Sequence, residues 1–335
     1  MIVESDLIRF PYTPDLTAGG VAYACRELIH RRQQLGTLPI GRMRRIVVET
    51  AVELAFRHYI DGLEVPYRVL NAGAFSEPDR YDVSLGGHRC ILKTNHISDP
   101  KRVANIRRDP GVLLSSQAHI SVDELSTRSQ RLDDILLFAY LLCLAPALRT
   151  DTPASDFRDR SDYLIHTLPF EWALPGSWEA LEPLALKSEC EQPVTVQLGG
   201  MDADHSVITT MVELMPRERV IVKDQFFSLA YIHVQDKLTA RIGIHSPRRG
   251  KAYVIPPSSW NNIWIHGTDI MLAGWLTHDQ FRSNSKVPTL KHVAVKYIRP
   301  PVKELSLPLR ELNPCSPLFR RVKTWAEGRT SGDSR

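Results

Sequence analysis

Two short strands joined by a turn are predicted around residue 86, and this hairpin constrains the fold more than any other feature of the chain. Residues 81–85 and 89–94 are rich in β-branched and apolar side chains, and Gly86-Gly87 lies between them. A Gly-Gly pair between two such runs is typical of a tight antiparallel hairpin. We therefore expect a β-sheet in this region of the chain.

An aspartate and a lysine occupy the two strands of this hairpin. Asp82 lies in the first predicted strand, and Lys93 lies near the end of the second. Because side chains at i and i+2 of a strand point to the same face, residue 91 and Lys93 should share one. The turn then allows Asp82 and Lys93 to converge. Asn95 and His96, just beyond the lysine, are candidates for substrate contact.

The hairpin is flanked by segments with clear patterns of their own. Apolar residues recur at helical spacing over residues 43–60, and Glu49 and Glu53 lie one turn apart on that predicted helix, so they share a face. Residues 99–108 predict a second helix after the hairpin. The run 133–143 is so apolar that it must be buried, and its periodicity leaves open whether it is a central strand or a core helix.

The order of these features resembles the PD-(D/E)xK nuclease superfamily, in which an Asp is followed by a strand that ends in (D/E)-x-K. The resemblance covers residues 43–143 and implies a restriction-endonuclease-like α/β core. It also implies Mg²⁺-dependent hydrolysis of phosphodiester bonds in DNA. In that case Asp82 and Glu53 hold the metal, Glu49 is a reserve ligand, and Lys93 orients the attacking water or stabilises the transition state.

The chain departs from the family pattern at one position. Ile91 stands two residues before Lys93, where the family has its second acid. An aliphatic side chain cannot bind Mg²⁺, which takes oxygen ligands, and it desolvates the neighbouring ammonium group. Either Glu53 or Glu49 has taken over the role of the missing acid, or the site is inactive and the fold serves as a binding platform.

Beyond residue 150 the composition and the hydrophobic pattern of the sequence change. Residues 151–193 are rich in Pro, Asp and Trp and predict a linker or an elaborated connection. Residues 194–320 hold short β-branched or aromatic runs between turn signals, which predict a β-rich, mostly antiparallel domain. Residues 321–335 are expected to form a disordered tail, and residues 1–150 the nuclease-like domain.

Charge is distributed unevenly along the chain. The net charge is only +4, yet residues 121–200 carry 13 acids against 6 bases, and residues 286–335 carry 11 bases against 4 acids. Such segregation is compatible with a surface that binds a polyanion, and the nuclease resemblance points to DNA. An ordinary solvated face with a basic tail explains the same distribution.

A further basic segment lies between two predicted strands of the β-rich domain. Residues 241–251 hold four bases and no acid, and Arg248, Arg249 and Lys251 follow a Ser-Pro pair. Contact with phosphate is the functional interpretation of this loop, and a solvated hairpin tip is the structural one. Together with Asn95, these three residues are the candidate substrate contacts.

Other chemistries lack support in the sequence. The five cysteines are scattered without a C-x-x-C pair, which argues against a disulfide framework or a cysteine zinc site and favours the cytoplasm. The chain has neither a signal-peptide pattern nor an apolar run of membrane length. Motifs for nucleotide cofactors or a serine nucleophile are absent. The sequence Asp202-Ala-Asp204-His205 is better explained as a polar turn than as a metal loop.

We therefore expect an α/β protein with a restriction-endonuclease-like core in its N-terminal half, followed by a mostly antiparallel β-rich module. Its expected work is on DNA, as a Mg²⁺-dependent nuclease or as a catalytically degenerate relative. A setting in restriction or mobile-element defence rests on analogy of fold alone. The alternative is an interaction protein whose β-rich module binds a protein partner and whose N-terminal half is a scaffold, with no membrane involved.

Overall fold

The computed structural model divides the chain into two compact units. The described residues are 1–35, 40–69, 83–125, 131–144, 162–235, 238–250, 252–286 and 304–332. Unit 1 comprises Met1–Leu16, Val48–Leu148 and His266–Arg335, and unit 2 comprises Thr17–Val47 and Arg149–Ile265. The protein is of the mixed α/β class, with one mixed sheet in unit 1 and antiparallel sheets in both units.

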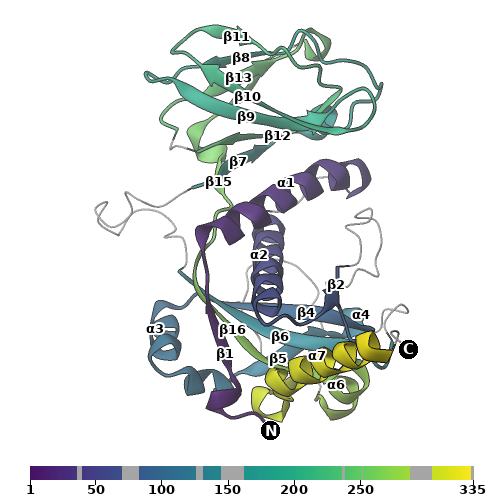
Figure 1. The fold of residues 1–335 in the computed structure, drawn as a ribbon. Helices are drawn as coiled ribbons and strands as arrows, with labels where there is room; N and C mark the ends of the chain where they lie inside the picture. Colours follow the sequence, from purple (N-terminus) through teal and green to yellow (C-terminus); the bar gives the residue numbers. More distant parts are fainter. Residues whose placement is uncertain are drawn as a thin grey trace. The chain divides into compact units, whose positions relative to one another are not determined.

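The core of unit 1 is a six-stranded mixed sheet with the strand order β1-β16-β6-β4-β3-β2 (Figure 1). Strands β2, β3 and β4 form an antiparallel meander, and β6 lies parallel to β4. On the far side of β6, strands β16 and β1 are antiparallel to their neighbours. The bounds are β1 (Ile8–Pro11), β2 (Tyr67–Arg68), β3 (Val83–Leu85), β4 (His88–Ile97), β6 (Ile135–Leu144) and β16 (His266–Thr277).

The predicted hairpin is present as β3 and β4. Gly86 and Gly87 join the two strands with φ angles of 57° and 88°, a backbone region that glycine enters without the steric cost of a Cβ atom. The predicted helices on either side are α2 (Ile40–Gly62) and α3 (Pro100–Arg108). Helix α3 begins where the Asp99 carboxylate accepts a hydrogen bond of 2.7 Å from the Arg102 amide, which stabilises that end.

The apolar run 133–143 proves to be a strand. It forms most of β6, which lies between β4 and β16 in the middle of the sheet. Every side chain from Ile135 to Cys143 is buried. A strand that is covered on both faces has no polar face to alternate with, so it reads as a continuous apolar run. Periodicity alone therefore could not separate this strand from a buried helix.

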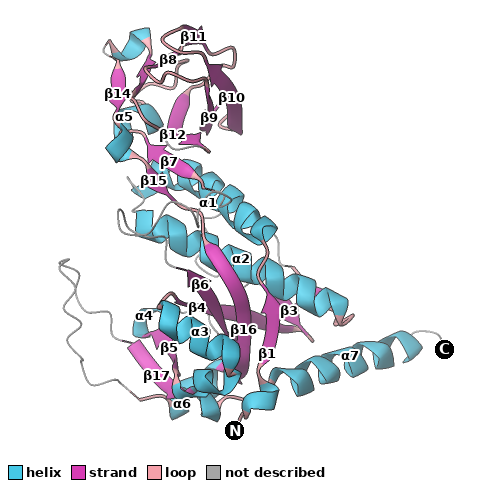
Figure 2. Cartoon of the chain, turned by 90° about the vertical axis from the view of Figure 1, so that its left-hand side faces the viewer, coloured by secondary structure: helices cyan, strands magenta, loops and turns pink. Residues whose placement is uncertain are grey.

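One face of the sheet is covered by α3, α6 and a small two-stranded sheet (Figure 2). Phe138 of β6 stacks on Phe281 of α6 (His278–Asn284), with ring centroids 5.5 Å apart. Residues of α3, β5 (Gln117–Ser121) and β17 (Glu304–Pro308) join the same apolar cluster. The short helix α4 (Val122–Leu125) and the 3₁₀ segments Glu4–Asp6, Pro110–Ser115 and Leu309–Glu311 complete this layer.

The opposite face is covered by α2 and the C-terminal helix α7 (Cys315–Gly332). Phe10 of β1 stacks on Tyr59 of α2, with ring centroids 5.2 Å apart. The strand register puts Phe10 on the same face as Ile270 of β16, away from Phe138. Phe319 of α7 contacts the rings of both Phe56 and Tyr59. Unit 1 therefore has three layers, with the sheet in the middle.

The expected boundaries of the N-terminal domain differ from those of unit 1. Strand β16 and helix α7 belong to unit 1 and not to the β-rich module, because β16 pairs with β6 from His266 to Thr277. The stretch 321–335 was expected to be disordered, but α7 continues through it as far as Gly332, and its residue Val322 is buried. Pairing between strands more than a hundred residues apart leaves no signal in the local pattern.

Unit 2 contains two antiparallel sheets that pack face to face, since residues of both join one apolar cluster. The five-stranded sheet has the order β10-β9-β12-β7-β15, and the four-stranded sheet has the order β11-β8-β13-β14. The bounds are β7 (Leu164–Thr167), β8 (Ala185–Ser188), β9 (Val194–Met201), β10 (Val207–Leu214), β11 (Arg219–Ile221), β12 (Ser228–Val234), β13 (Ile242–His245), β14 (Tyr253–Ile255) and β15 (Asn261–Asn262).

The segment expected to be a linker contributes to both of these sheets. Within 151–193, residues 162–193 carry β7, the short helix α5 (Phe170–Ala173) and β8, and residues 151–161 lie outside the described part of the chain. The outer face of the five-stranded sheet contacts α1 (Pro14–Leu35), where the Cys25 thiol lies 3.5 Å from the Tyr163 hydroxyl. An N-terminal helix is therefore part of the β-rich unit.

Candidate functional site

Lys93 lies near the middle of β4, between β3 and β6. Its Cα atom is paired with Phe138 of the parallel strand β6, so both side chains point to the face that carries α3 and α6. The lysine is half-buried. The structure therefore places the predicted catalytic cation on an inner strand, at the layer of α3.

Ile91 shares this face of β4, as the two-residue spacing predicts. Its side chain is half-buried and packs against the apolar cluster that includes Leu136 and Phe138. Burial of an aliphatic side chain stabilises the fold by removing apolar surface from water. The residue at the position where the nuclease pattern has an acid thus has a packing role in unit 1.

Glu53 and Glu49 lie on α2, in the other layer. Glu53 is buried, with 7% of its surface exposed, and its carboxylate forms an ion pair with Arg57 one turn further along the helix. Glu49 is exposed. Because α2 covers the face that carries Phe10, Glu53 and Lys93 lie on opposite sides of the sheet. The structure does not bring this predicted pair together.

Two of the predicted site residues, Asp82 and Lys251, lie outside the described residues. Asn95 is described, and it lies on the same face of β4 as Lys93, beside Tyr140 of β6. The Tyr140 hydroxyl donates a hydrogen bond of 2.8 Å to the carbonyl of Gln117. Lys93 and Asn95 are therefore the two predicted residues that the described structure places side by side on one strand face.

A buried ion pair on this same face was not predicted. Asp134 is 1% exposed, and its carboxylate accepts a hydrogen bond of 2.8 Å from the Arg131 amide and lies 3.3 Å from the Arg89 guanidinium. Arg89 and Lys93 are four residues apart on β4, which corresponds to about 13 Å along a strand. The Asp134 carboxylate is thus held by Arg89, near the start of β4. In the sequence, the buried ion pair was signalled only by the two acids Asp133 and Asp134 before the apolar run.

The basic loop between β13 and β14 makes contacts within unit 2. The Arg248 guanidinium forms an ion pair with Glu179. The Arg249 guanidinium lies 5.9 Å from the centroid of the Trp172 ring, and burial lowers its pKa. Both predicted phosphate contacts are thus held against neighbouring side chains, so the tip of this loop is tied to its own unit.

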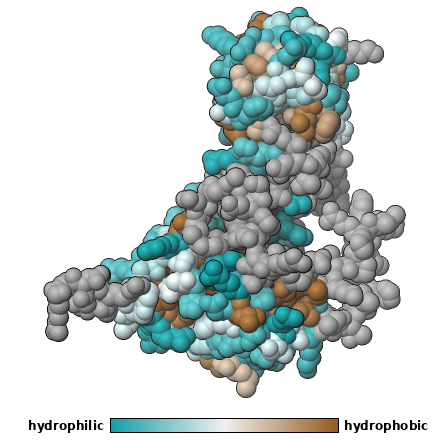
Figure 3. Space-filling view, turned by 90° about the vertical axis from the view of Figure 1, so that its right-hand side faces the viewer, coloured by the Kyte–Doolittle hydropathy of each residue, from teal (hydrophilic) through white to brown (hydrophobic). Residues whose placement is uncertain are grey.

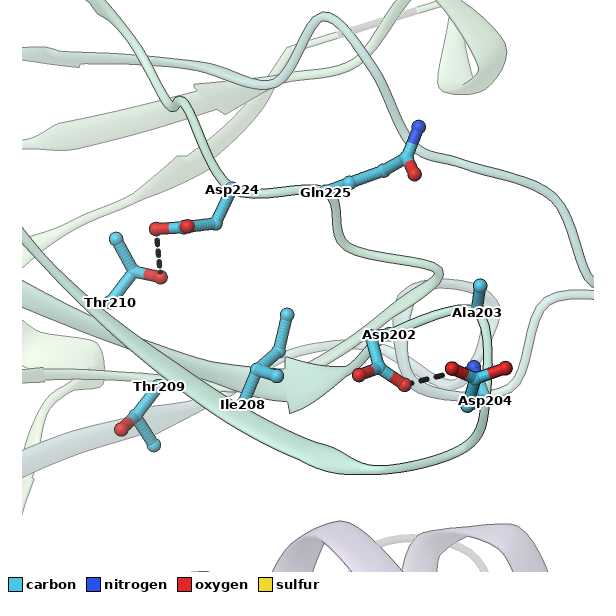
Figure 4. A pocket seen from close by; sticks show the side chains of 8 residues that line it. All are labelled: Asp202, Ala203, Asp204, Ile208, Thr209, Thr210, Asp224 and Gln225. Atoms are coloured by element: carbon cyan, nitrogen blue, oxygen red, sulfur yellow. Dashed lines mark hydrogen bonds between the residues drawn. The ribbon is translucent and has the colours of Figure 1, made fainter.

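The acidic segment between β9 and β10 is a polar turn. The Asp202 carboxylate accepts hydrogen bonds of 2.9 Å from the amides of Asp204 and Ser206. Figure 4 shows Asp224 on the far side of Ile208, where it accepts a hydrogen bond of 2.7 Å from the Thr210 hydroxyl. The carboxylates of Asp202 and Asp224 are therefore engaged in turn and strand contacts on either side of a shallow pocket that both residues line. No group of three His, Cys, Asp or Glu side chains that could hold a metal ion occurs among the described residues.

Exposed apolar side chains are scattered over the two units. On the face shown in Figure 3 they appear in small groups among hydrophilic side chains. Across the part of the chain that the structure describes, the exposed large apolar residues are Met1, Val3, Leu63, Val69, Leu132, Phe170, Met211, Met215, Ile221, Val254 and Trp325. Single exposed apolar residues are ordinary and do not by themselves mark an interface.

Comparisons with protein families, with curated proteins and with solved structures find no match to this chain. In the described ranges, no helix has both the length and the apolar character needed to cross a membrane.

Proposed function

We propose that unit 1 is a degenerate PD-(D/E)xK-like module that binds DNA without cutting it. The order of its elements supports the fold part of this proposal. Helix α2 is followed by the β2–β3–β4 meander, then by α3, and then by β6 parallel to β4. The resemblance to these nucleases implies the same succession of helix, strands, helix and buried strand.

The packing of Ile91 is the observation that carries the loss of cleavage. Ile91 belongs to the apolar layer beneath α3 and α6, so a substitute acid would have to reach Lys93 from elsewhere. Glu53, the leading substitute, is paired with Arg57 on the other side of the sheet. The described residues therefore do not fit a Mg²⁺ site, which needs several oxygen ligands around one point.

The charges of α3 support DNA as the partner. Lys101, Arg102 and Arg108 are exposed on this helix, which lies on the Lys93 side of the sheet. Arg102 and Arg108 donate hydrogen bonds to the uncharged side chains of Ser116 and Asn105. Arg107 is also exposed, but it forms an ion pair of 2.8 Å with the carboxylate of Asp269. A row of exposed bases can neutralise the phosphates of a duplex, and the release of counterions then drives binding. In this proposal α3 is the helix that contacts the DNA backbone.

Binding of the full chain to a fluorescent duplex, measured over a range of salt concentrations, tests this assignment. The double variant Lys101→Gln/Arg108→Gln should weaken binding and make the log–log salt slope shallower by about 2, because each phosphate contact contributes about one unit. The matched control is Arg219→Gln/Lys223→Gln, which neutralises two exposed bases of unit 2. Equal slopes for the two double variants would exclude α3 as the contact.

The active nuclease is the second candidate, because Lys93 and Asn95 do share a strand face on the inner strand β4. It predicts Mg²⁺- or Mn²⁺-dependent cleavage of plasmid or single-stranded DNA, abolished in both Asp82→Ala and Lys93→Ala proteins. Such a result would overturn the degenerate site. Binding without cleavage supports our proposal. Failure to bind DNA at all would favour the third candidate, an interaction protein that uses unit 2 to recognise another protein.

A further inference from the structure

Unit 2 contains a pocket that the sequence patterns did not indicate. It lies between α1 and the outer face of the five-stranded sheet, and its volume is about 750 Å³. This is within the range of small-molecule sites, about 300–1,000 Å³. Small and apolar side chains of α1, including Ala18, Val21 and Ala22, form one wall, and β9, β10 and β12 form the other.

The floor of this pocket is a cluster of hydrogen-bonding side chains. The Tyr163 hydroxyl donates a hydrogen bond of 3.0 Å to the Gln197 side-chain oxygen. The Cys25 thiol lies 3.5 Å from the same hydroxyl and also contacts the hydroxyl of Tyr231. Convergent polar side chains beside apolar walls are the usual means of orienting a bound molecule.

Rigid aromatic rings fix the shape of this floor. The Tyr163 ring stacks on His233 with nearly parallel planes, 3° apart. The ring of Tyr231 lies over Gly199 of the neighbouring strand, so closely that a Cβ atom at Gly199 would overlap it. Trp264 adds a further half-buried ring to the lining. The rings are thus held in place before any ligand arrives, which lowers the entropic cost of binding.

The floor is uncharged at neutral pH. Burial raises the pKa of the Cys25 thiol to about 11 and raises the pKa of both tyrosine hydroxyls well above their usual value. Burial also lowers the pKa of His233 to about 4, so its imidazole is neutral. Of the charged residues of the lining, Arg26 is exposed, and the Asp162 carboxylate accepts a hydrogen bond of 2.6 Å from the Asn262 side-chain amide. A neutral group is therefore suited to the floor.

We propose that this pocket of unit 2 binds a nucleobase, whose ring stacks on Tyr163 or Trp264 and whose edge is read by Gln197 and the two tyrosine hydroxyls. A base combines a flat aromatic face with several neutral donors and acceptors at its edge, and aromatic stacking tolerates every base. The base is either that of a free nucleoside or one extruded from DNA, and only the second source rests on the DNA binding proposed above.

The first test is calorimetric titration of the full chain with adenosine, guanosine, cytidine and thymidine. Ala22→Phe fills the pocket from an exposed position of α1, and Ala252→Phe adds the same side chain at an exposed position outside it. At least one nucleoside should bind the wild type and the Ala252→Phe control with the same affinity. Its affinity for Ala22→Phe should be at least about tenfold lower, which corresponds to about 1.4 kcal/mol. Unchanged far-UV circular dichroism shows that both variants fold.

The second test identifies an extruded base as the source. A base at a mismatch costs less to extrude than a paired one, so the wild type should prefer a duplex with a single mismatch to the matched duplex. Ala22→Phe should abolish that preference while duplex binding itself remains. If no nucleoside binds and no mismatch preference exists, the nucleobase pocket is wrong, even where duplex binding through α3 stands. If the wild type binds a nucleoside but no duplex, the result contradicts the DNA-binding proposal and leaves the nucleobase pocket standing.

Discussion

Lys93 and Glu53 lie on opposite faces of the six-stranded sheet of unit 1. Lys93 is paired with Phe138, whose ring packs on α6, whereas Glu53 belongs to α2, the helix that stacks on Phe10. The sheet therefore separates the two side chains that the sequence assigned to one site. This separation is one support for the inactive site proposed above. The packing of Ile91 and the ion pair of Glu53 give each residue a structural role that can be measured.

Ile91→Ala should destabilise the protein. Its side chain is half-buried against the apolar cluster beneath α3 and α6, so truncation removes packing and leaves a small void, at a cost of about 1–2 kcal/mol. Urea unfolding followed by far-UV circular dichroism measures the change. Leu132→Ala is the control, because Leu132 is 61% exposed in the same unit. Equal stability of both variants would show that Ile91 has no packing role.

Glu53→Gln should lower the free energy of unfolding more in the wild-type protein than in the Arg57→Met variant. The two side chains form a buried ion pair on α2, with 10% and 22% of their side-chain surfaces exposed. Removing one partner leaves the other charge buried and uncompensated. A double-mutant cycle in urea should give a coupling of about 1–3 kcal/mol. Additive effects would show that Glu53 is held by something other than Arg57.

The local elements of unit 1 could be predicted from the sequence, but their partners could not. The Gly86-Gly87 turn and the helices around it follow from residues close together in the chain, and all of them are present. The pairing of β16 with β6 joins residues such as Thr277 and Ile135. Such pairing depends on which buried strands find each other, and no short pattern encodes that choice.

The candidate site was predicted only in part for the same reason. Strand spacing correctly put Ile91 and Lys93 on one face, because that relation is local. Which face of the sheet α2 covers is decided by contacts of Phe10 and Tyr59 across the fold. The pocket of unit 2 combines side chains from α1 and from strands far along the chain, such as Tyr231 of β12. No motif spacing connects these residues.

The stability of the protein should depend on pH through His233. Burial lowers the pKa of this imidazole from 6.5 to about 4, so the unfolded chain binds a proton more readily than the folded one between these values. The contribution of His233 is thus fully present above about pH 6.5 and is lost as the pH falls toward 4, with a slope of up to about 1.4 kcal/mol per pH unit.

Thermal unfolding of wild type and His233→Gln between pH 4 and pH 8 checks this dependence. Below pH 6.5 the stability of His233→Gln should fall less steeply with decreasing pH than that of the wild type, by the contribution of one titrating group. Above pH 7 the two plots of stability against pH should run parallel. His245→Gln is the matched control, since His245 is a half-buried histidine of the same unit. The same slope in the wild type and in His233→Gln would show that His233 does not titrate differently in the folded and unfolded states.

Gly199→Ala should destabilise unit 2 and displace the ring of Tyr231. A Cβ atom at this position would overlap that ring, which is fully buried and cannot move aside without disturbing its contacts. Overpacking of this kind costs about 1–3 kcal/mol. Gly243→Ala is the control, because its Cβ would meet only the Lys187 carbonyl oxygen, at 3.9 Å. Both glycines lie in strands, so they share the intrinsic gain in strand preference.

The two variants also separate stability from pocket shape. In Gly199→Ala the displaced ring should change the floor of the pocket, so any nucleoside that binds the wild type should bind this variant more weakly, whereas Gly243→Ala should bind as the wild type does. Near-ultraviolet circular dichroism reports the environment of the tyrosines directly. A spectrum and an unfolding midpoint unchanged by Gly199→Ala would mean that Tyr231 does not lie against this glycine, and the geometry assigned to the pocket floor would fail with it.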